Sequence, residues 1–370
     1  MQLPITLRGF LLLSATIIIS CSSTGVLESE ALLLIDKDDI LQDVLVLSAD
    51  DMEGRAPATA GEVKAADFIS MRFKSNGLLP IDGSYYQPFQ MLGVKKISEK
   101  SSLSIRKQAE DLRYESDVNL TYSSTSKKEV IDFNDAPLVF VGYGVEAPEY
   151  GWDDIKGTDL KGKVLLFLND DPPVTENGVD LFKGEARTYY GRWTYKFEQA
   201  ARLGAVGAMI IHTTKSASYP FSVIQYSGSS KNFTLDLPEQ NSELDLVAWI
   251  DSTNSNIIAQ SMGTNLMGLF EMSANRNFKP IDTGFKITAH IENEIGSVQT
   301  KNVLGLLPGS DPVLQNQYIV LTAHYDHLGQ NDDLEGDDKI YNGALDNALG
   351  TSCIINMANA FSSLKNRPRR

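Results

Sequence analysis

A continuous apolar run, Tyr318–Ala323, sets the strongest limit on the architecture of this chain. Such a run is typical of a strand that is buried on both faces of a sheet, as strands of parallel sheets are. Two similar runs, Lys163–Leu168 and Ala208–Ile211, occur upstream, and residues 197–201 between them carry a helical apolar stripe. The sequence therefore predicts an α/β protein.

Composition narrows the class of protein further. The chain has 370 residues, with 48 Asp and Glu against 33 Lys and Arg, which gives a net charge of −15. Hydrophobic residues at 42% and charged residues at 22% are ordinary for a folded protein, so disordered, collagen-like and disulfide-scaffold classes are excluded. The acidic balance argues against a nucleic acid partner, which clustered basic residues would bind.

The N-terminus is typical of a targeting segment. Arg8 precedes the apolar stretch Phe10–Ile19, which is too short to span a membrane and fits a secretory signal peptide. The stretch ends in Ile18-Ile19-Ser20-Cys21, which resembles a bacterial lipobox with Cys21 as the lipidated residue; a signal peptide with an incidental cysteine is the alternative. We expect residues 1–20 to be a lipoprotein signal peptide and 21–36 a tether. The protein would then be lipid-anchored in a bacterial cell envelope, with the membrane as a partner and Cys353 outside any disulfide.

The remaining sequence contains two predicted helices and one β-rich region. A helix is predicted over about 62–76, because Ala65, Phe68, Ile69 and Phe73 form an apolar stripe, and another over about 348–364. Short β runs broken by glycine fill 135–260, which is therefore predicted to be an inserted β-rich domain.

Two short motifs carry the residues suited to chemistry. His324 and Asp326 follow the predicted buried strand and would point to the same side of it, as a metal ligand and the group that orients it do. A structural hydrogen-bonded pair is the alternative. Asp346 lies in a glycine-bracketed turn before the last helix, where it is either a metal ligand or simply an N-cap.

Ala323-His-Tyr-Asp326 followed by Gly343-Ala-Leu-Asp-Asn347 resembles the zinc-dependent aminopeptidases with a co-catalytic di-zinc centre, relatives of glutamate carboxypeptidases and the transferrin receptor. The resemblance implies that His324 binds one zinc ion, that Asp346 bridges two, and that Asp326 orients the histidine as a catalytic residue. It also implies a metal-bridging water that attacks the peptide substrate.

The resemblance extends to the domain organisation. Residues 37–134, including Leu47–Arg55, look like the N-terminal segment of the peptidase domain. Residues 135–260, with Gly142-Tyr-Gly144, look like an inserted protease-associated domain. Residues 261–370 look like the first half of the catalytic domain. We therefore expect an incomplete mixed-sheet α/β/α zinc-peptidase domain with an inserted β-rich protease-associated domain.

Part of the family site has no counterpart here. No acidic residue follows Asp346 and no histidine follows His327, whereas the family uses a Glu-Glu pair and two later ligands. The chain therefore resembles the first part of a longer enzyme, or a truncated derivative, and residues 1–370 alone are expected to be inactive. Glu53 fits a surface loop better than a substitute base, and His327 would face away from His324 on a strand.

Two functions stay open at this point. The first is a zinc aminopeptidase that removes N-terminal residues from peptides. The second is a non-catalytic surface lipoprotein that binds protein or peptide through its protease-associated domain. A serine hydrolase is excluded by the lack of a Gly-x-Ser-x-Gly elbow.

Overall fold

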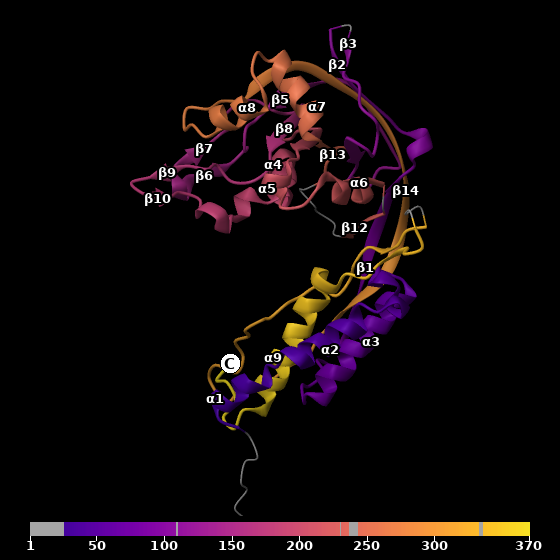
Figure 1. Cartoon of the computed structure of the whole chain (residues 1–370), viewed down its shortest axis with the longest axis vertical. Helices are drawn as coiled ribbons and strands as arrows, with labels where there is room; N and C mark the ends of the chain where they lie inside the picture. Colours follow the sequence, from indigo (N-terminus) through magenta and orange to yellow (C-terminus); the bar gives the residue numbers. More distant parts are fainter. Residues whose placement is uncertain (1–25, 109, 230, 237–242, 333–335) are drawn as a thin grey trace, which may run out of the picture. The chain divides into compact units, whose positions relative to one another are not determined.

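The structure is a computed structural model that describes residues 26–108, 110–229, 231–236, 243–332 and 336–370. The chain divides into two compact units, the first made of residues up to Phe89 together with Thr300–Arg370, and the second of Gln90–Gln299 (Figure 1). Strands β1 (Tyr86–Lys96) and β14 (Ile281–Val303) have residues in both units. The predicted signal peptide and Cys21 lie outside the described residues.

The second unit is built around a mixed sheet. The strands of this unit besides β1 and β14 are β2 (Ser102–Lys107), β3 (Glu110–Asp111), β4 (Leu120–Ser123), β5 (Val130–Phe140), β6 (Glu146–Ala147), β7 (Trp152–Asp153), β8 (Val164–Leu168), β9 (Thr175–Glu176), β10 (Val179–Asp180), β11 (Gly207–Ile211), β12 (Asn232–Leu235) and β13 (Leu246–Ile250). Its helices are α4 (Trp193–Arg202), α5 (Thr214–Ala217), α6 (Phe221–Ser229), α7 (Ser252–Ser261) and α8 (Leu266–Ser273).

The large sheet has the strand order β12-β1-β14-β5-β8-β11-β13-β4, with β2 and β3 off this path. Strands β5, β8, β11 and β13 are parallel to one another, whereas β14 pairs antiparallel with β5 and β4 pairs antiparallel with β13. Helix α4 connects β8 to β11, as a crossover between parallel strands requires. The α/β class with a large mixed sheet is thus confirmed, and residues 135–260 lie within this unit.

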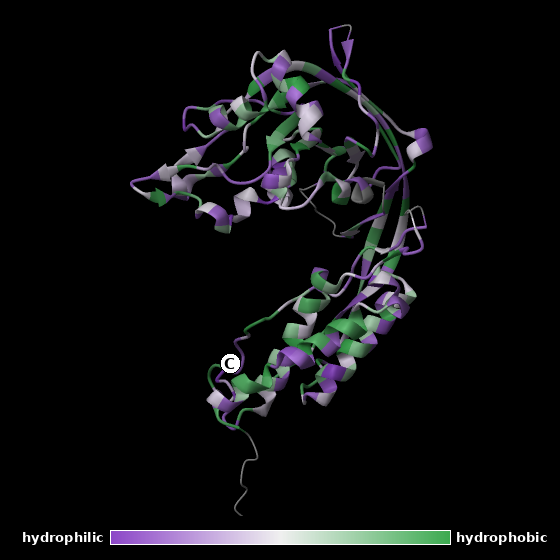
Figure 2. Cartoon of the chain, viewed as in Figure 1, coloured by the Kyte–Doolittle hydropathy of each residue, from purple (hydrophilic) through white to green (hydrophobic). Residues whose placement is uncertain are grey.

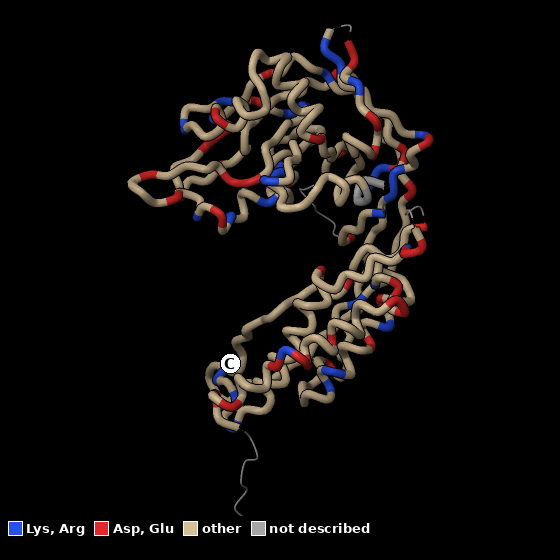
Figure 3. Tube along the Cα trace, viewed as in Figure 1, with Lys and Arg blue, Asp and Glu red and all other residues tan. Residues whose placement is uncertain are grey.

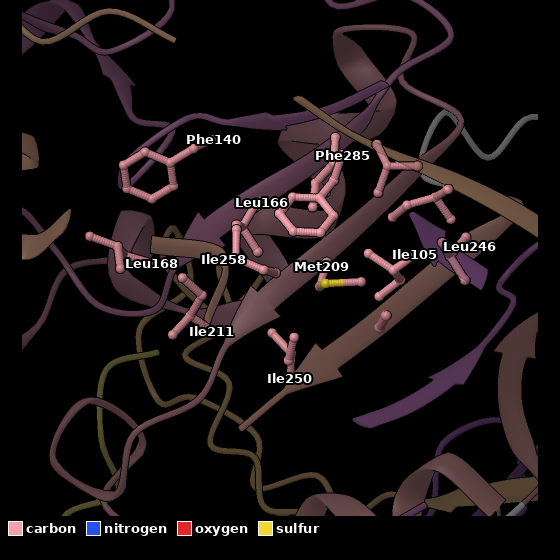
Figure 4. Close-up of a cluster of buried hydrophobic side chains, with 14 of the residues drawn as sticks. Ile105, Phe140, Leu166, Leu168, Met209, Ile211, Leu246, Ile250, Ile258 and Phe285 are labelled. Atoms are coloured by element: carbon pink, nitrogen blue, oxygen red, sulfur yellow. The ribbon is translucent and has the colours of Figure 1, made fainter. Parts of the chain in front are cut away.

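Alternate residues of the central strands face two different cores. Leu166 of β8 and Met209 of β11 pack in one cluster, whereas Phe167 and Ile210, their next residues, pack in the other. Figure 4 shows the first of these clusters around Met209. Every residue of β8 and β11 is buried, which confirms that the two upstream apolar runs are strands covered on both faces.

The first unit is mainly helical. Its elements besides the ends of β1 and β14 are α1 (Glu28–Ala31), α2 (Lys37–Leu47), α3 (Ala60–Ser75), β15 (Gly329–Gln330), β16 (Ile340–Tyr341) and α9 (Leu349–Ser363), with 3-10 turns at Leu32–Leu34 and Asp50–Arg55. Thr59 caps α3 by accepting a hydrogen bond from the Glu62 N–H, and Gly77 follows its C-terminus with φ +77°. Green and purple alternate along α2 and α3 in Figure 2, as amphipathic helices require.

The two helices predicted in this unit are confirmed. Helix α3 buries Ala65, Ile69 and Phe73 of the predicted stripe. Helix α9 buries Ile355, whereas its Phe361 is exposed.

The strand predicted at Tyr318–Ala323 is wrong. These residues form no strand, and Tyr318, Ile319 and Val320 are each at least 70% exposed. No strand among the described residues pairs with this segment, so neither a hydrogen-bonded neighbour nor a covering layer is present to bury it. The apolar run is therefore an exposed hydrophobic stretch of the first unit.

Residues 26–34 differ from the tether predicted for 21–36. The Val26 N–H donates to the Ser363 carbonyl at 2.9 Å, and the Lys365 N–H donates to the Val26 carbonyl at 2.8 Å. Ala31 is buried. The start of the described chain is therefore joined to the end of α9 by backbone hydrogen bonds.

No helix in the described ranges is long and apolar enough to cross a membrane. Acidic and basic residues are interspersed along both units (Figure 3).

Candidate functional site

Two segments of the first unit, His324–His327 and Gly343–Asp346, bring their polar side chains together. His324 Nε2 lies 3.2 Å from Asp346 Oδ1, and His324 Nδ1 lies 3.4 Å from Asp326 Oδ1. His327 Nδ1 lies 4.0 Å from the second Asp346 carboxylate oxygen. Two imidazoles and two carboxylates therefore form one cluster, which we call the histidine–aspartate cluster.

The cluster faces solvent on one side and the protein on the other. The side chains of His324 and Asp346 are 55% and 70% exposed, whereas that of His327 is 15% exposed. Burial lowers the pKa of His327, and the Asp346 carboxylate opposes this shift. A neutral imidazole, the form that binds metal ions, is thus favoured at the buried position.

Asn347, just before α9, and Thr351, in the first turn of α9, hold the backbone of His324. The Asn347 side-chain amide donates to the His324 carbonyl at 3.2 Å, and the Thr351 hydroxyl donates to the same oxygen at 3.1 Å. Asp346 precedes this turn with φ −122° and ψ 90°, and the Asp346–Asn347 peptide bond is cis. The N-cap interpretation of Asp346 is wrong, because Ala348 occupies the N-cap of α9.

Gly343 makes the close approach of the two segments possible. Its φ is +62°, and a Cβ at this position would lie 2.5 Å from the Asp346 carbonyl oxygen and 2.6 Å from the His327 ring. Any other residue would push the turn away from the histidines. The cluster therefore requires glycine at position 343, where a larger residue would not fit.

Arg55 lies behind the cluster and is fully buried. Its Nε donates to the Tyr325 carbonyl at 2.8 Å, Nη1 donates to the Asn342 carbonyl at 2.7 Å and to that of Leu47, and Nη2 donates to the Gly343 carbonyl at 3.0 Å. Burial lowers the pKa of Arg55, and the charges of Asp326 and Asp346 oppose this shift. One guanidinium therefore contacts both segments that carry the cluster.

The side chain of Tyr325 is also fixed by hydrogen bonds. Its hydroxyl donates to Glu62 Oε1 at 3.1 Å and to the Lys301 carbonyl at 2.7 Å. Burial and the neighbouring Glu62 carboxylate raise the pKa of this hydroxyl. The residue between His324 and Asp326 is thus fixed at both its backbone and its ring.

Sequence reasoning missed His327 and Arg55. The expectation that His327 faces away from His324 assumed a continuing strand, and the segment is not extended in that way. Arg55 gives no sequence pattern beyond its place after Glu53-Gly54, where all three residues have positive φ. Glu53 itself forms an exposed ion pair with Lys64 at 2.8 Å, as a surface carboxylate does.

The donor set of the cluster fits part of a zinc site. Two ligand atoms on one tetrahedral zinc ion, each bonded at about 2.1 Å, lie about 3.4 Å apart. The 3.2 Å separation of His324 Nε2 and Asp346 Oδ1 is close to this value. No group of three or more His, Cys, Asp or Glu side chains in the part of the chain described here is arranged to hold a metal ion. The described residues therefore supply two ligands, whereas catalytic zinc takes three.

The other histidines lie in the second unit. His290, in β14, pairs with Asp132 of β5 at 2.7 Å, and His212 follows β11 and is buried among aromatic rings. Neither contacts a second histidine.

Comparison with known proteins links the cluster to a peptidase family. Residues 302–370 match the model of Peptidase family M28, and this segment contains His324, Asp326 and Asp346. No curated protein matches the chain.

Solved structures similar to this chain include three bacterial enzymes. An aminopeptidase from Aneurinibacillus sp. strain AM-1 is 18% identical with a TM-score of 0.42, over 90% of this chain and 61% of that one. A zinc aminopeptidase from Bacillus subtilis is 16% identical with a TM-score of 0.34, over 88% and 57%. A peptidase M28 precursor from Shewanella amazonensis is 16% identical with a TM-score of 0.43, over 93% and 65%. The chain thus spans 57–65% of the length of these proteins.

Proposed function

We propose that this chain belongs to a zinc-dependent metallopeptidase of the aminopeptidase type, which removes N-terminal residues from peptides. The observation that carries the proposal is the 3.2 Å approach of His324 Nε2 to Asp346 Oδ1 inside the segment that matches Peptidase family M28. An imidazole and a carboxylate from positions 22 residues apart in the sequence meet here. Both side chains are exposed, so packing in a hydrophobic core does not explain why they lie together.

In this proposal His324 and Asp346 would hold the metal, and the Asp346 carboxylate would be shared between two ions. Asp326 approaches His324 Nδ1 with its carboxylate, and its backbone oxygen lies 3.2 Å from the same nitrogen. Acceptors at Nδ1 hold the proton there and leave Nε2 free to bind a metal ion. The chemistry that zinc would supply there is Lewis-acid polarisation of the scissile carbonyl and activation of water.

The described residues supply no general base next to this pair. Glu53 is engaged by Lys64, and Glu62 is a buried acceptor for Tyr325 and for the Thr300 hydroxyl. Loss of a general base costs about 10²–10⁴-fold in rate. We therefore propose that residues 1–370 alone bind zinc and do not turn over peptides.

Zinc titration by isothermal calorimetry tests this proposal. We expect binding by the chain, and we expect His324→Ala and Asp346→Asn each to weaken it at least 10-fold, because each removes one of two ligands. His290→Ala is the matched control, since it removes an exposed histidine paired with a carboxylate in the other unit. Unchanged zinc affinity in both site variants contradicts the metal assignment. Release of leucine from leucyl peptides that His324→Ala abolishes contradicts the expected inactivity.

A non-catalytic binding protein is the second candidate. A groove on the second unit favours it: aromatic side chains of Trp193, Phe197 and Phe233 line it, together with the carboxylates of Glu198 and Glu243. The absence of zinc binding in the titration would favour this candidate over the peptidase.

We also propose that lipidated Cys21 anchors the protein to a bacterial cell envelope. The support is the apolar stretch Phe10–Ile19, which Ser20 and Cys21 follow in the sequence.

A further inference from the structure

Arg55 forms a connection between the two segments that the proposed metal ligands come from. Tyr325, whose carbonyl accepts from Nε, lies between His324 and Asp326. Asn342 and Gly343, whose carbonyls accept from Nη1 and Nη2, begin the turn that ends in Asp346. The two sides of one rigid, planar guanidinium thus contact both segments.

The backbone around Arg55 adds to this connection. The His327 N–H donates to the Arg55 carbonyl at 3.2 Å. A Cβ on the preceding Gly54 would lie 2.3 Å from the Gly329 carbonyl oxygen and 2.7 Å from that of Tyr341, so the turn packs directly on β15 and β16, which adjoin the two segments in the sequence. Arg55 is therefore held in place at its own backbone as well as through its side chain.

The partners of Arg55 are unusual for a buried arginine. Its hydrogen-bond acceptors in the described part of the chain are all backbone carbonyls, and no carboxylate described there lies within ion-pair distance of it. A guanidinium has five N–H donors in a fixed fork, so it can bind several carbonyls at defined angles where an ammonium group cannot. The hydrogen bonds of Arg55 therefore fix the distance between the two backbone segments, and they do not neutralise the charge of a carboxylate.

We propose that Arg55 is the positioning residue that sets the separation of His324 from Asp346. This inference rests on the proposed function, since it assigns the two residues as a ligand pair. Metal sites require their ligands to be held within about 0.5 Å of the productive geometry, so loosening either segment weakens the pair. Arg55 acts through the two backbones and touches neither substrate nor metal.

Two measurements on Arg55→Met, Arg55→Lys and wild-type chain test the inference. Hydrogen–deuterium exchange reports the two segments directly, without a metal ion. Titration with Co²⁺, followed by its visible absorption, reports the affinity and geometry of the ligand pair. Arg72→Met is the matched control, because Arg72 is a half-buried arginine of the same unit that pairs with buried Asp43 at 3.0 Å, away from the cluster.

In Arg55→Met we expect exchange at residues 324–329 and 341–346 to rise at least 10-fold while α3 changes less than about threefold. We expect Co²⁺ affinity to fall at least 10-fold. Arg55→Lys should show smaller changes in both, because one ammonium group keeps the charge and reaches only some of the carbonyls. Arg72→Met should leave both readouts at the cluster within twofold of wild type. If Arg55→Met does not fold, Arg55→Lys carries the same comparison.

Equal effects of Arg55→Met and Arg72→Met would overturn the inference, because general destabilisation would explain both. Unchanged exchange and Co²⁺ affinity in the Arg55 variants would overturn it as well. If wild-type chain binds no Co²⁺, the proposed function fails, and the exchange data alone decide whether Arg55 positions the two segments.

Discussion

Lys196 places an ammonium group in the interior of the second unit. It is fully buried, and its Nζ donates to the carbonyls of Tyr143, Asp170 and Tyr190 at 2.8–3.0 Å. Burial lowers the pKa of Lys196 to about 7, and the charges of Asp171, Asp154 and Asp170 oppose this shift. The second unit therefore holds a lysine that loses its proton near neutral pH.

This lysine predicts a pH dependence of stability. Between pH 7 and about pH 10 the unfolded chain keeps a proton that the folded unit has lost, so the free energy of unfolding rises with pH in this window, by at most about 1.4 kcal/mol per pH unit. Urea titrations followed by tryptophan fluorescence measure it, because all three tryptophans, Trp152, Trp193 and Trp249, lie in this unit.

Lys196→Met should flatten that pH profile, and Lys215→Met, which removes an exposed lysine, should not. A wild-type profile that is flat between pH 7 and pH 10 would show that the ammonium stays charged in the folded unit.

Sequence motifs predicted only part of the residues in the candidate site. His324, Asp326 and Asp346 stand in short motifs whose residue types suit metal binding, and the structure brings these three together. Arg55 was missed, because an arginine that binds backbone carbonyls needs no partner side chain and so leaves no pattern. The assignment of the three residues as ligands stays a prediction.

At the scale of elements, the spacing of apolar residues correctly predicted the helices and strands that neighbouring elements cover. The stripe of α3 and the apolar runs of β8 and β11 identify those elements, since each is covered by neighbours that the described chain contains. Tyr318–Ala323 carries the same kind of signal and forms no strand, because a strand also needs a hydrogen-bonded neighbour. An apolar run shows that a segment is able to form a buried strand, whereas the neighbouring strands and covering layers decide whether it does.

The turn from Gly343 to Asp346 offers a test at this scale. Gly343→Ala should weaken zinc binding at least 10-fold, because the added Cβ would contact the Asp346 carbonyl and the His327 ring. Gly77→Ala is the control: Gly77 has a similar φ of +77° but open space around its Cβ position. The left-handed backbone conformation costs alanine about 1–2 kcal/mol in both variants. Equal zinc affinities in the two variants would rule out a role for the close approach.

At the scale of the whole molecule, the two compact units differ in architecture. The second unit buries parallel strands in two cores, whereas the first is mainly helical and leaves Tyr318, Ile319 and Val320 exposed. An exposed apolar stretch of this kind favours association. The predicted α/β class holds, while the assignment of residues 135–260 to a protease-associated domain stays a prediction.

The proposed lipid anchor is also a property of the whole molecule. Expressed in a bacterium with its first 20 residues, the protein should fractionate with membranes, and its mass should exceed that of unmodified residues 21–370 by an acyl-glycerol group. Cys21→Ser should move it to the soluble fraction and abolish the added mass. Cys353→Ser is the control. Membrane association that survives Cys21→Ser would contradict the anchor.

The most direct test of the account is a crystal structure of the zinc-soaked chain with data collected at the zinc absorption edge. We predict an anomalous peak about 2.0–2.2 Å from both His324 Nε2 and an oxygen of Asp346. An absent peak, or a peak only at other residues such as His290 and Asp132, would contradict the assignment of His324 and Asp346 as the zinc ligands.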